Sequence, residues 1–142
     1  MGKNIGYWAS TGLVALAIGM GGVMDLMAPP ELAAGMAHLG YPAYFLIILG
    51  LWKVAGAAAI LVPRVPLLKE WAYAGIAFDL TGAAASHAFS GDGPGEVITP
   101  LVILALAATS WALRPASRRL AASVEPTGIV SVTPPTASAQ PA

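Results

Sequence analysis

The chain has 142 residues, of which 57% are hydrophobic and 10% are charged, and its mean hydropathy is +0.73. Soluble domains carry about 25% charged residues, so this composition predicts a small membrane protein of one domain and excludes disorder over most of the length. Seven basic and seven acidic residues balance, which argues against a nucleic-acid partner, and the absence of cysteine excludes disulfides and thiolate metal sites.

Four apolar segments follow one another along the chain. They cover residues 7–28, 43–62, 71–89 and 97–113, and prolines or glycine-rich turns separate them. A helix needs roughly 17–20 residues to cross about 30 Å of hydrocarbon, and backbone groups in lipid must hydrogen-bond internally. Because no sustained alternation favours strands, the sequence predicts an all-α fold, a membrane four-helix bundle.

Two further segments differ from these spans. Residues 30–40 are too short to cross a bilayer, and Leu32, Met36 and Leu39 recur at helical spacing, so we expect a short interfacial helix between the first two spans. Residues 121–142 are rich in Ser, Thr, Pro and Ala and lack aromatic residues. This composition predicts a disordered cytoplasmic tail after a membrane domain of residues 1–120.

The loop charges predict the orientation. Six of the seven basic residues lie in the N-terminus, the second loop and the C-terminal flank, which four crossings place on one side: Lys3, Arg64, Lys69, Arg114, Arg118 and Arg119. The charged residues of the opposite loops are all acidic, namely Glu31, Asp92 and Glu96. The positive-inside rule therefore predicts that both termini are cytoplasmic.

Lys53 and Asp79 lie halfway along the second and third spans. An isolated charge at that depth costs about 2.5–3.5 kcal/mol on insertion scales, so we expect the two side chains to pair inside the bundle. Two interpretations stay open. The pair fixes which helices are neighbours, or it forms the polar floor of a ligand cavity or a proton site.

A second polar set lies nearer the outer face. Ser86 and His87 share a helix face with Asp79, and Asp25 lies near the end of the first span. Together they predict a polar funnel leading to Lys53, with Trp52 and Phe78 on its apolar wall. The alternative is that Asp25, Glu96 and His38 face water at the headgroup level. Small residues on the first span (Gly12, Ala15, Gly19, Gly22) predict close helix packing or, as the alternative, room for a ligand. No metal-ligand spacing and no catalytic motif are present in the sequence.

Several short segments resemble the DoxX-like family of small bacterial membrane proteins. They are GGVMDL at 21–26, HLGYP at 38–42, WK at 52–53, EWAYAG at 70–75 and FDLTGAAASH at 78–87. The resemblance covers roughly residues 4–120 and implies a four-helix bundle in the bacterial inner membrane. Relatives that gave the family its name are linked to a thiosulfate:quinone oxidoreductase and to membrane redox assemblies.

These observations favour an accessory subunit, or a binder of a small lipophilic, quinone-like molecule, in a membrane redox system. The lipid bilayer, a membrane redox partner or further copies of the chain are the expected partners. A small transporter, a proton-conducting protein, an electron-transfer subunit and a purely structural membrane subunit are the alternatives.

Overall fold

The computed structural model describes residues 2–120, and this part of the chain is all-helical. Five α-helices and one 3₁₀ helix follow in order: α1 (Gly2–Met27), α2 (Pro30–His38), α3 (Phe45–Leu61), α4 (Pro66–Phe89), α5 (Pro94–Ala112) and η1 (Ala116–Arg118). The predicted tail, residues 121–142, lies outside the described residues.

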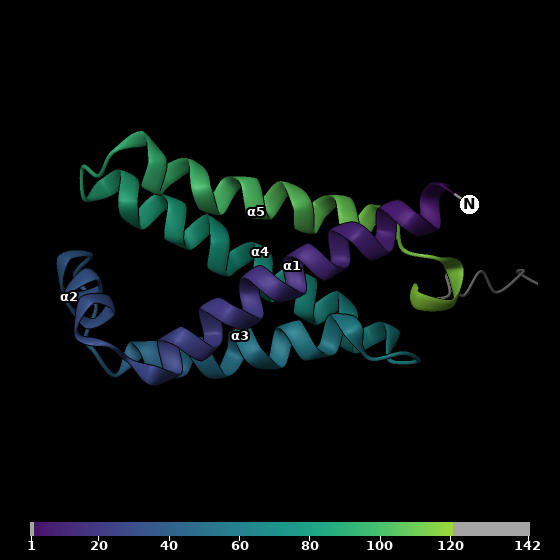
Figure 1. Ribbon diagram of the computed structural model, residues 1–142, viewed down its shortest axis with the longest axis horizontal. Helices are drawn as coiled ribbons and strands as arrows, with labels where there is room; N and C mark the ends of the chain where they lie inside the picture. The colour runs from purple at the N-terminus through teal and green to yellow at the C-terminus, as the bar shows by residue number, and fades with distance from the viewer. Residues whose placement is uncertain (1, 121–142) are drawn as a thin grey trace, which may run out of the picture.

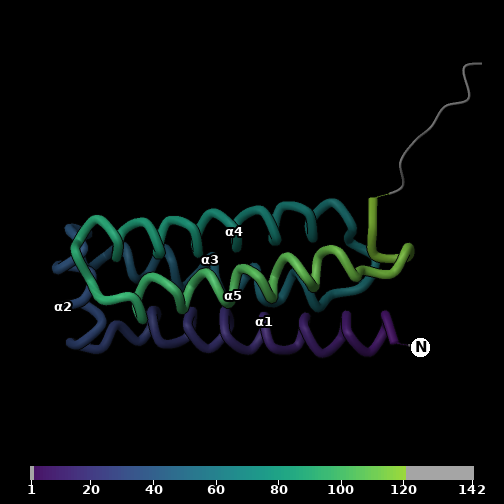
Figure 2. Tube along the Cα trace, turned by 90° about the horizontal axis from the view of Figure 1, so that it is seen from above, coloured from purple at the N-terminus to yellow at the C-terminus, as the bar shows by residue number. Residues whose placement is uncertain are grey.

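The four long helices run side by side, whereas α2 is a short segment at one end (Figure 1). Each long helix packs against two others, so that α1, α3, α4 and α5 close a ring in that order. Figure 2 shows α2 at the end opposite the N-terminus. We call this the α2 end, and the opposite end, which carries the N-terminus, the α3–α4 turn and residues 113–120, the basic end.

Prolines and left-handed backbone positions mark the helix boundaries. Pro30, Pro66 and Pro94 each occupy the first turn of a helix, where the missing amide hydrogen is not needed. The chain turns into α2 through Ala28 and out of it through Gly40, both with positive φ. Gly40 adopts φ +85° without strain because it has no Cβ.

Two helices of the described chain, α1 and α5, are long and apolar enough to cross a membrane by length and composition. The apolar helix α3 is shorter, with 17 residues. The helix α4 begins at Pro66, five residues before the predicted span, and therefore includes Lys69 and Glu70. The prediction that Lys69 is a loop charge was wrong, since its side chain is fully buried in the first turn of α4.

The core fills the middle of the ring with aliphatic side chains from all four long helices. Val14, Ile18, Ile60, Ile76 and Ala107 are each at most 5% exposed. The outward faces of the same helices carry large exposed apolar side chains, such as Leu16, Leu51 and Val102. An apolar exterior of this extent is unusual for a soluble monomer and typical of a surface that meets lipid or another chain.

Candidate functional site

Three charged side chains from three helices meet inside the bundle. The Lys53 ammonium of α3 donates a hydrogen bond of 2.9 Å to Oδ2 of Asp25 on α1. Oδ2 of Asp79 on α4 lies 3.9 Å from the same nitrogen, beyond hydrogen-bond distance but within ion-pair range. We call Asp25, Lys53 and Asp79 the charged triad; its two carboxylates share one ammonium.

The triad differs from the sequence prediction in its closest pair. One interpretation of the sequence placed Asp25 in water at the headgroup level, but its side chain is buried, with 6% exposed. Its carboxylate also lies closer to the Lys53 ammonium than that of Asp79 does. Lys53 has a flexible stem that extends from the middle of α3 toward the end of α1. The position of its Cα in the span therefore did not determine the depth of its ammonium.

A close approach of two glycines positions Asp25 against Lys53. A Cβ atom built on Gly50 would lie 2.7 Å from the carbonyl oxygen of Gly22 and 2.9 Å from the amide nitrogen of Leu26. A Cβ on Gly22 would lie 2.8 Å from Cβ of Lys53. The backbones of α1 and α3 can touch here only because both residues are glycine. Gly12, by contrast, has open space around it, so only part of the predicted small-residue stripe serves packing.

Three cavities surround Lys53 and Asp79. The α3–α4 cavity has a volume of about 430 Å³ and is lined, apart from these two residues, by apolar side chains and glycine. Trp52 and Trp71 form part of its wall, and both are exposed on the outside of the bundle. A molecule in this cavity would therefore contact charge at one end and apolar surface along its length.

The α2 cavity lies between α2, α3 and α4 and has a volume of about 520 Å³. Five of the six predicted site residues line it: Asp25, Lys53, Asp79, Ser86 and His87. The sixth, Trp52, lines the α3–α4 cavity instead. A third space of about 630 Å³, between α1, α4 and α5, also reaches Lys53, Asp79 and His87.

Asp92 connects the short helix α2 to the bundle above the α2 cavity. His38 Nε2 donates to Oδ1 of Asp92 at 2.6 Å, and His87 Nδ1 donates to Oδ2 at 2.7 Å. The hydrogen bonds from His87 and His38 hold the pKa of Asp92 below its usual range. Tyr41 and Ser86 share a further hydrogen bond of 2.9 Å. We call the group His38, His87 and Asp92 the clasp; it fixes α2 over the cavity.

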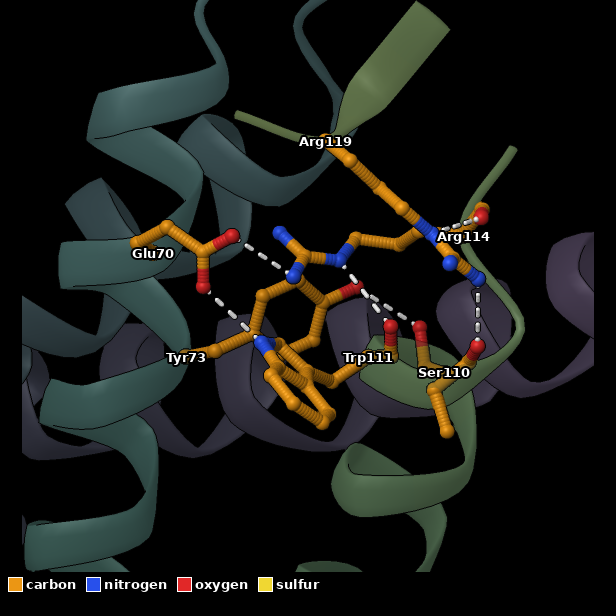
Figure 3. Close-up of polar contacts among 7 residues, drawn as sticks. Glu70, Tyr73, Ser110, Trp111, Arg114 and Arg119 are labelled. Atoms are coloured by element: carbon orange, nitrogen blue, oxygen red, sulfur yellow. Dashed lines mark hydrogen bonds and ion pairs between the residues drawn. The ribbon is translucent and has the colours of Figure 1, made fainter. Parts of the chain in front are cut away.

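A second polar network closes the basic end (Figure 3). Glu70 accepts hydrogen bonds from Arg114 Nη2 at 2.7 Å and from Trp111 Nε1 at 2.9 Å. Arg114 is 3% exposed and lies 5.2 Å from the ring centre of Tyr73. The Tyr73 hydroxyl bonds Ser110 at 2.7 Å, so the network ties α4 to α5 and to the segment after it.

The network continues into the interior of the bundle. Ser110 also bonds the hydroxyl of Thr11 on α1 at 2.6 Å, and both side chains are fully buried. Lys69 donates to the carbonyl of Ala59 at 2.9 Å and to that of Ile60, two groups of the last turn of α3. A cation at a helix C-terminus satisfies these carbonyls and opposes the helix dipole.

Sequence reasoning missed Asp92 and the buried roles of Lys69 and Arg114, because all three counted only as loop charges. A usable signal existed for Arg114, since the acid Glu70 lies among the basic residues of the same end and was a candidate ion-pair partner. Within residues 2–120, no group of three or more His, Asp or Glu side chains could hold a metal ion.

The model of the DoxX-like family matches residues 9–110, which is most of the chain and contains the whole triad. Comparison with curated proteins and with solved structures gave no significant match.

Proposed function

The chain belongs to the DoxX-like family, and from this premise we propose that it is a four-helix, multi-pass membrane protein that binds a small lipophilic molecule beside the charged triad. The quinone-like class fits best, and a redox system of the bacterial inner membrane is its proposed setting. The observation that carries the proposal is the placement of Lys53 and Asp79 where the α3–α4 and α2 cavities meet.

The membrane location is supported by the family and by two helices, α1 and α5, that are long and apolar enough to span a bilayer. The helices α3 and α4 complete the ring in this proposal. The charges agree with it, because Asp25 is buried and Lys53 and Asp79 are mostly buried between helices, while large apolar side chains face outward.

The ligand class follows from the shape and polarity of the two cavities. The α3–α4 cavity offers apolar length, and Lys53 stands at its polar end. The ammonium has three N–H donors, of which Asp25 takes one at hydrogen-bond distance. A second N–H can donate to a ligand carbonyl, and the Asp79 carboxylate, which has no hydrogen bond within residues 2–120, can exchange a proton with a ligand hydroxyl.

Ligand binding can be tested with a short-chain quinone and the purified full-length protein in neutral detergent. Lys53→Met and Asp79→Asn should each weaken binding at least tenfold, measured by quenching of tryptophan fluorescence. An apolar hydrocarbon of the same ring size serves as the ligand control. If it binds as tightly as the quinone and equally to both variants, the polar end of the cavity is irrelevant and the proposal fails.

A steric test avoids the charges altogether. Gly75 lines the α3–α4 cavity and has open space around it, so Gly75→Leu should fill the cavity and abolish binding. Gly12→Leu is the matched control, because Gly12 also has open space but lines none of the three cavities. Unchanged binding by Gly75→Leu would place the ligand elsewhere.

The proposed orientation has its own test, which the lack of native cysteine makes simple. Ala37→Cys at the α2 end should react with a membrane-impermeant maleimide in intact cells. Ser117→Cys at the basic end should react only after the cells are opened. Equal reactivity of both, or the reverse pattern, would contradict cytoplasmic termini.

A proton-conducting or transport role is the second candidate. It is favoured by the excess carboxylate of the triad, since Asp25 and Asp79 share a single ammonium. A proteoliposome assay separates it from ligand binding and is taken up in the Discussion.

A further inference from the structure

The basic end carries more positive charge than its own carboxylates can balance. Within residues 2–120, Glu70 is the one acid at this end, and it already holds Arg114 and Trp111. Lys69 is buried on the carbonyls of α3. The remaining basic side chains take part in no ion pair of the described residues; they are Lys3, Arg64, Arg118 and Arg119.

Arg118 is anchored through one nitrogen of its guanidinium, and the other two nitrogens have no hydrogen-bond partner within the described residues. Its Nη1 donates to the Leu61 carbonyl at 3.2 Å and to the Tyr7 hydroxyl at 3.3 Å. Its carbon Cζ lies 4.6 Å from the ring centre of Trp8. Nε and Nη2 make no hydrogen bond within the described residues, and this edge of the guanidinium has the two-donor geometry that suits a phosphate group.

Arg119 is fixed in a similar way beside it. Its Nε donates to the Arg114 carbonyl at 2.6 Å, and its Nη2 donates to the Ala112 carbonyl at 2.8 Å, which leaves Nη1 without a partner in the described chain (Figure 3). Two guanidinium groups of neighbouring residues are thus anchored by backbone carbonyls rather than neutralised by acids. Anchored donors lose less freedom when they bind than free surface side chains do.

We propose that the basic end binds the phosphate of an anionic phospholipid, with Arg118 as the principal contact and Lys3, Arg64 and Arg119 supplying additional charge. The proposal rests on the membrane location proposed above. Trp8 and Trp111, each about half exposed at this end, are residue types that prefer the headgroup level of a bilayer. A headgroup with net negative charge is favoured over a zwitterionic one, because Glu70, the one acid among the described residues of this end, is already paired and cannot meet a choline or ethanolamine cation.

The test measures lipid preference on the full-length protein. The protein is exchanged into an equimolar mixture of phosphatidylglycerol and phosphatidylcholine, and the retained lipids are counted by native mass spectrometry. A basic side chain near an anionic surface contributes roughly a fivefold preference, so wild type should retain phosphatidylglycerol at least fivefold over phosphatidylcholine. Arg118→Gln should remove most of that preference, and Arg118→Lys should keep part of it.

Because Arg118 also contacts Leu61 and Tyr7, its loss could loosen the fold. The double variant Lys3→Gln, Arg64→Gln removes only exposed side chains and should lower the preference while leaving the melting temperature in phosphatidylcholine unchanged. Glu31→Gln at the α2 end is the matched control and should change nothing. Equal retention of the two lipids by wild type would overturn the inference.

Two further measurements distinguish a lipid from a soluble phosphate ligand, and the lipid preference from the membrane location. Millimolar inorganic phosphate should displace the lipid no better than chloride of equal ionic strength; selective displacement would indicate a soluble phosphate ligand and overturn the lipid assignment. Alkaline carbonate extraction tests the membrane location independently. If the protein remains in the membrane but shows no lipid preference, this inference fails and the proposed membrane location stands.

Discussion

The closest contact between α1 and α3 predicts a specific failure when Gly50 becomes alanine. The new Cβ would lie 2.7 Å from the Gly22 carbonyl oxygen, 2.7 Å from Cγ of Leu26 and 2.9 Å from the Leu26 nitrogen. Two of these neighbours are backbone atoms, so no change of side-chain rotamer relieves the clash. The helices must move apart, and the 2.9 Å contact between Asp25 and Lys53 directly beside the crossing must lengthen.

The magnitude follows from a matched control. Gly12→Ala introduces the same side chain into α1 with no atom within 4 Å of its Cβ. Alanine favours a helix by about 1 kcal/mol over glycine in both variants, so the difference between them isolates the steric term. Overpacking of this kind costs about 1–3 kcal/mol, which corresponds to roughly a 5- to 150-fold change in the folding equilibrium.

The assay is reversible unfolding in mixed micelles, followed by circular dichroism, for wild type and both variants. Gly50→Ala should be less stable than Gly12→Ala by the amount above, and it should also bind the quinone probe more weakly. If Gly50→Ala is as stable as Gly12→Ala, the helices do not meet at Gly22 and Gly50. The positioning of the triad by that contact would then be wrong.

The remaining predictions concern the two ends of the bundle. Asp92→Asn should loosen the clasp, so a cysteine placed at Gly82 in the α2 cavity should react several-fold faster with a maleimide than it does beside native Asp92. A cysteine placed at Gly75 in the α3–α4 cavity is the control and should react at an unchanged rate. If Asp92→Asn leaves the Gly82 cysteine rate unchanged, the clasp is refuted. Since the pKa of Asp92 is lowered in the folded state, the clasp's contribution should be present above about pH 4 and be lost as the pH falls further. A Gly82 cysteine rate that rises between pH 7 and 5 would contradict this assignment. Glu70→Gln leaves buried Arg114 without its counter-ion and should lower the free energy of unfolding in micelles by about 2–3 kcal/mol. This is less than the roughly 3–5 kcal/mol expected for a fully buried pair, because Glu70 is partly exposed. Glu31→Gln is the control and should leave the free energy of unfolding almost unchanged.

The helical architecture was predictable because hydropathy and proline positions act locally. Pro29 and Pro30 fix the end of α1 and the start of α2, whatever the rest of the chain does. The proximity of Lys53 and Asp79 was also predictable, since two opposite charges halfway along neighbouring apolar helices have few other partners. Whether these residues bind a ligand stays a prediction.

The finer geometry depends on long-range contacts that no local pattern encodes. Asp25 is the closer partner of Lys53 because a flexible side chain and a glycine contact set the distance, not the depth of the Cα atoms. Asp92 follows α4 in a turn, and its link to His38 joins residues 54 positions apart. Arg114 counted as a loop charge, yet it is buried, with Glu70 as its ion-pair partner and the rings of Tyr73 and Trp111 beside its guanidinium.

The distribution of polar groups along the bundle bears on whether the protein conducts protons. The α2 cavity and the space beside α5 contain titratable side chains from the triad to the α2 end. Toward the basic end, the α3–α4 cavity is lined only by apolar residues and glycine once Lys53 and Asp79 are passed. The buried layer of Val14, Ile18 and Ile76 separates the triad from the hydroxyls at the basic end.

A polar path that stops halfway supports ligand binding from the α2 end or from the bilayer, and not conduction across it. Proteoliposomes containing the wild-type protein should therefore dissipate an imposed pH gradient no faster than empty vesicles, as followed with an internal pH-sensitive dye. Asp79→Asn should give the same trace. Faster dissipation that Asp79→Asn abolishes would mean that protons cross the apolar layer, and the transport role would then replace ligand binding as the better explanation of the triad.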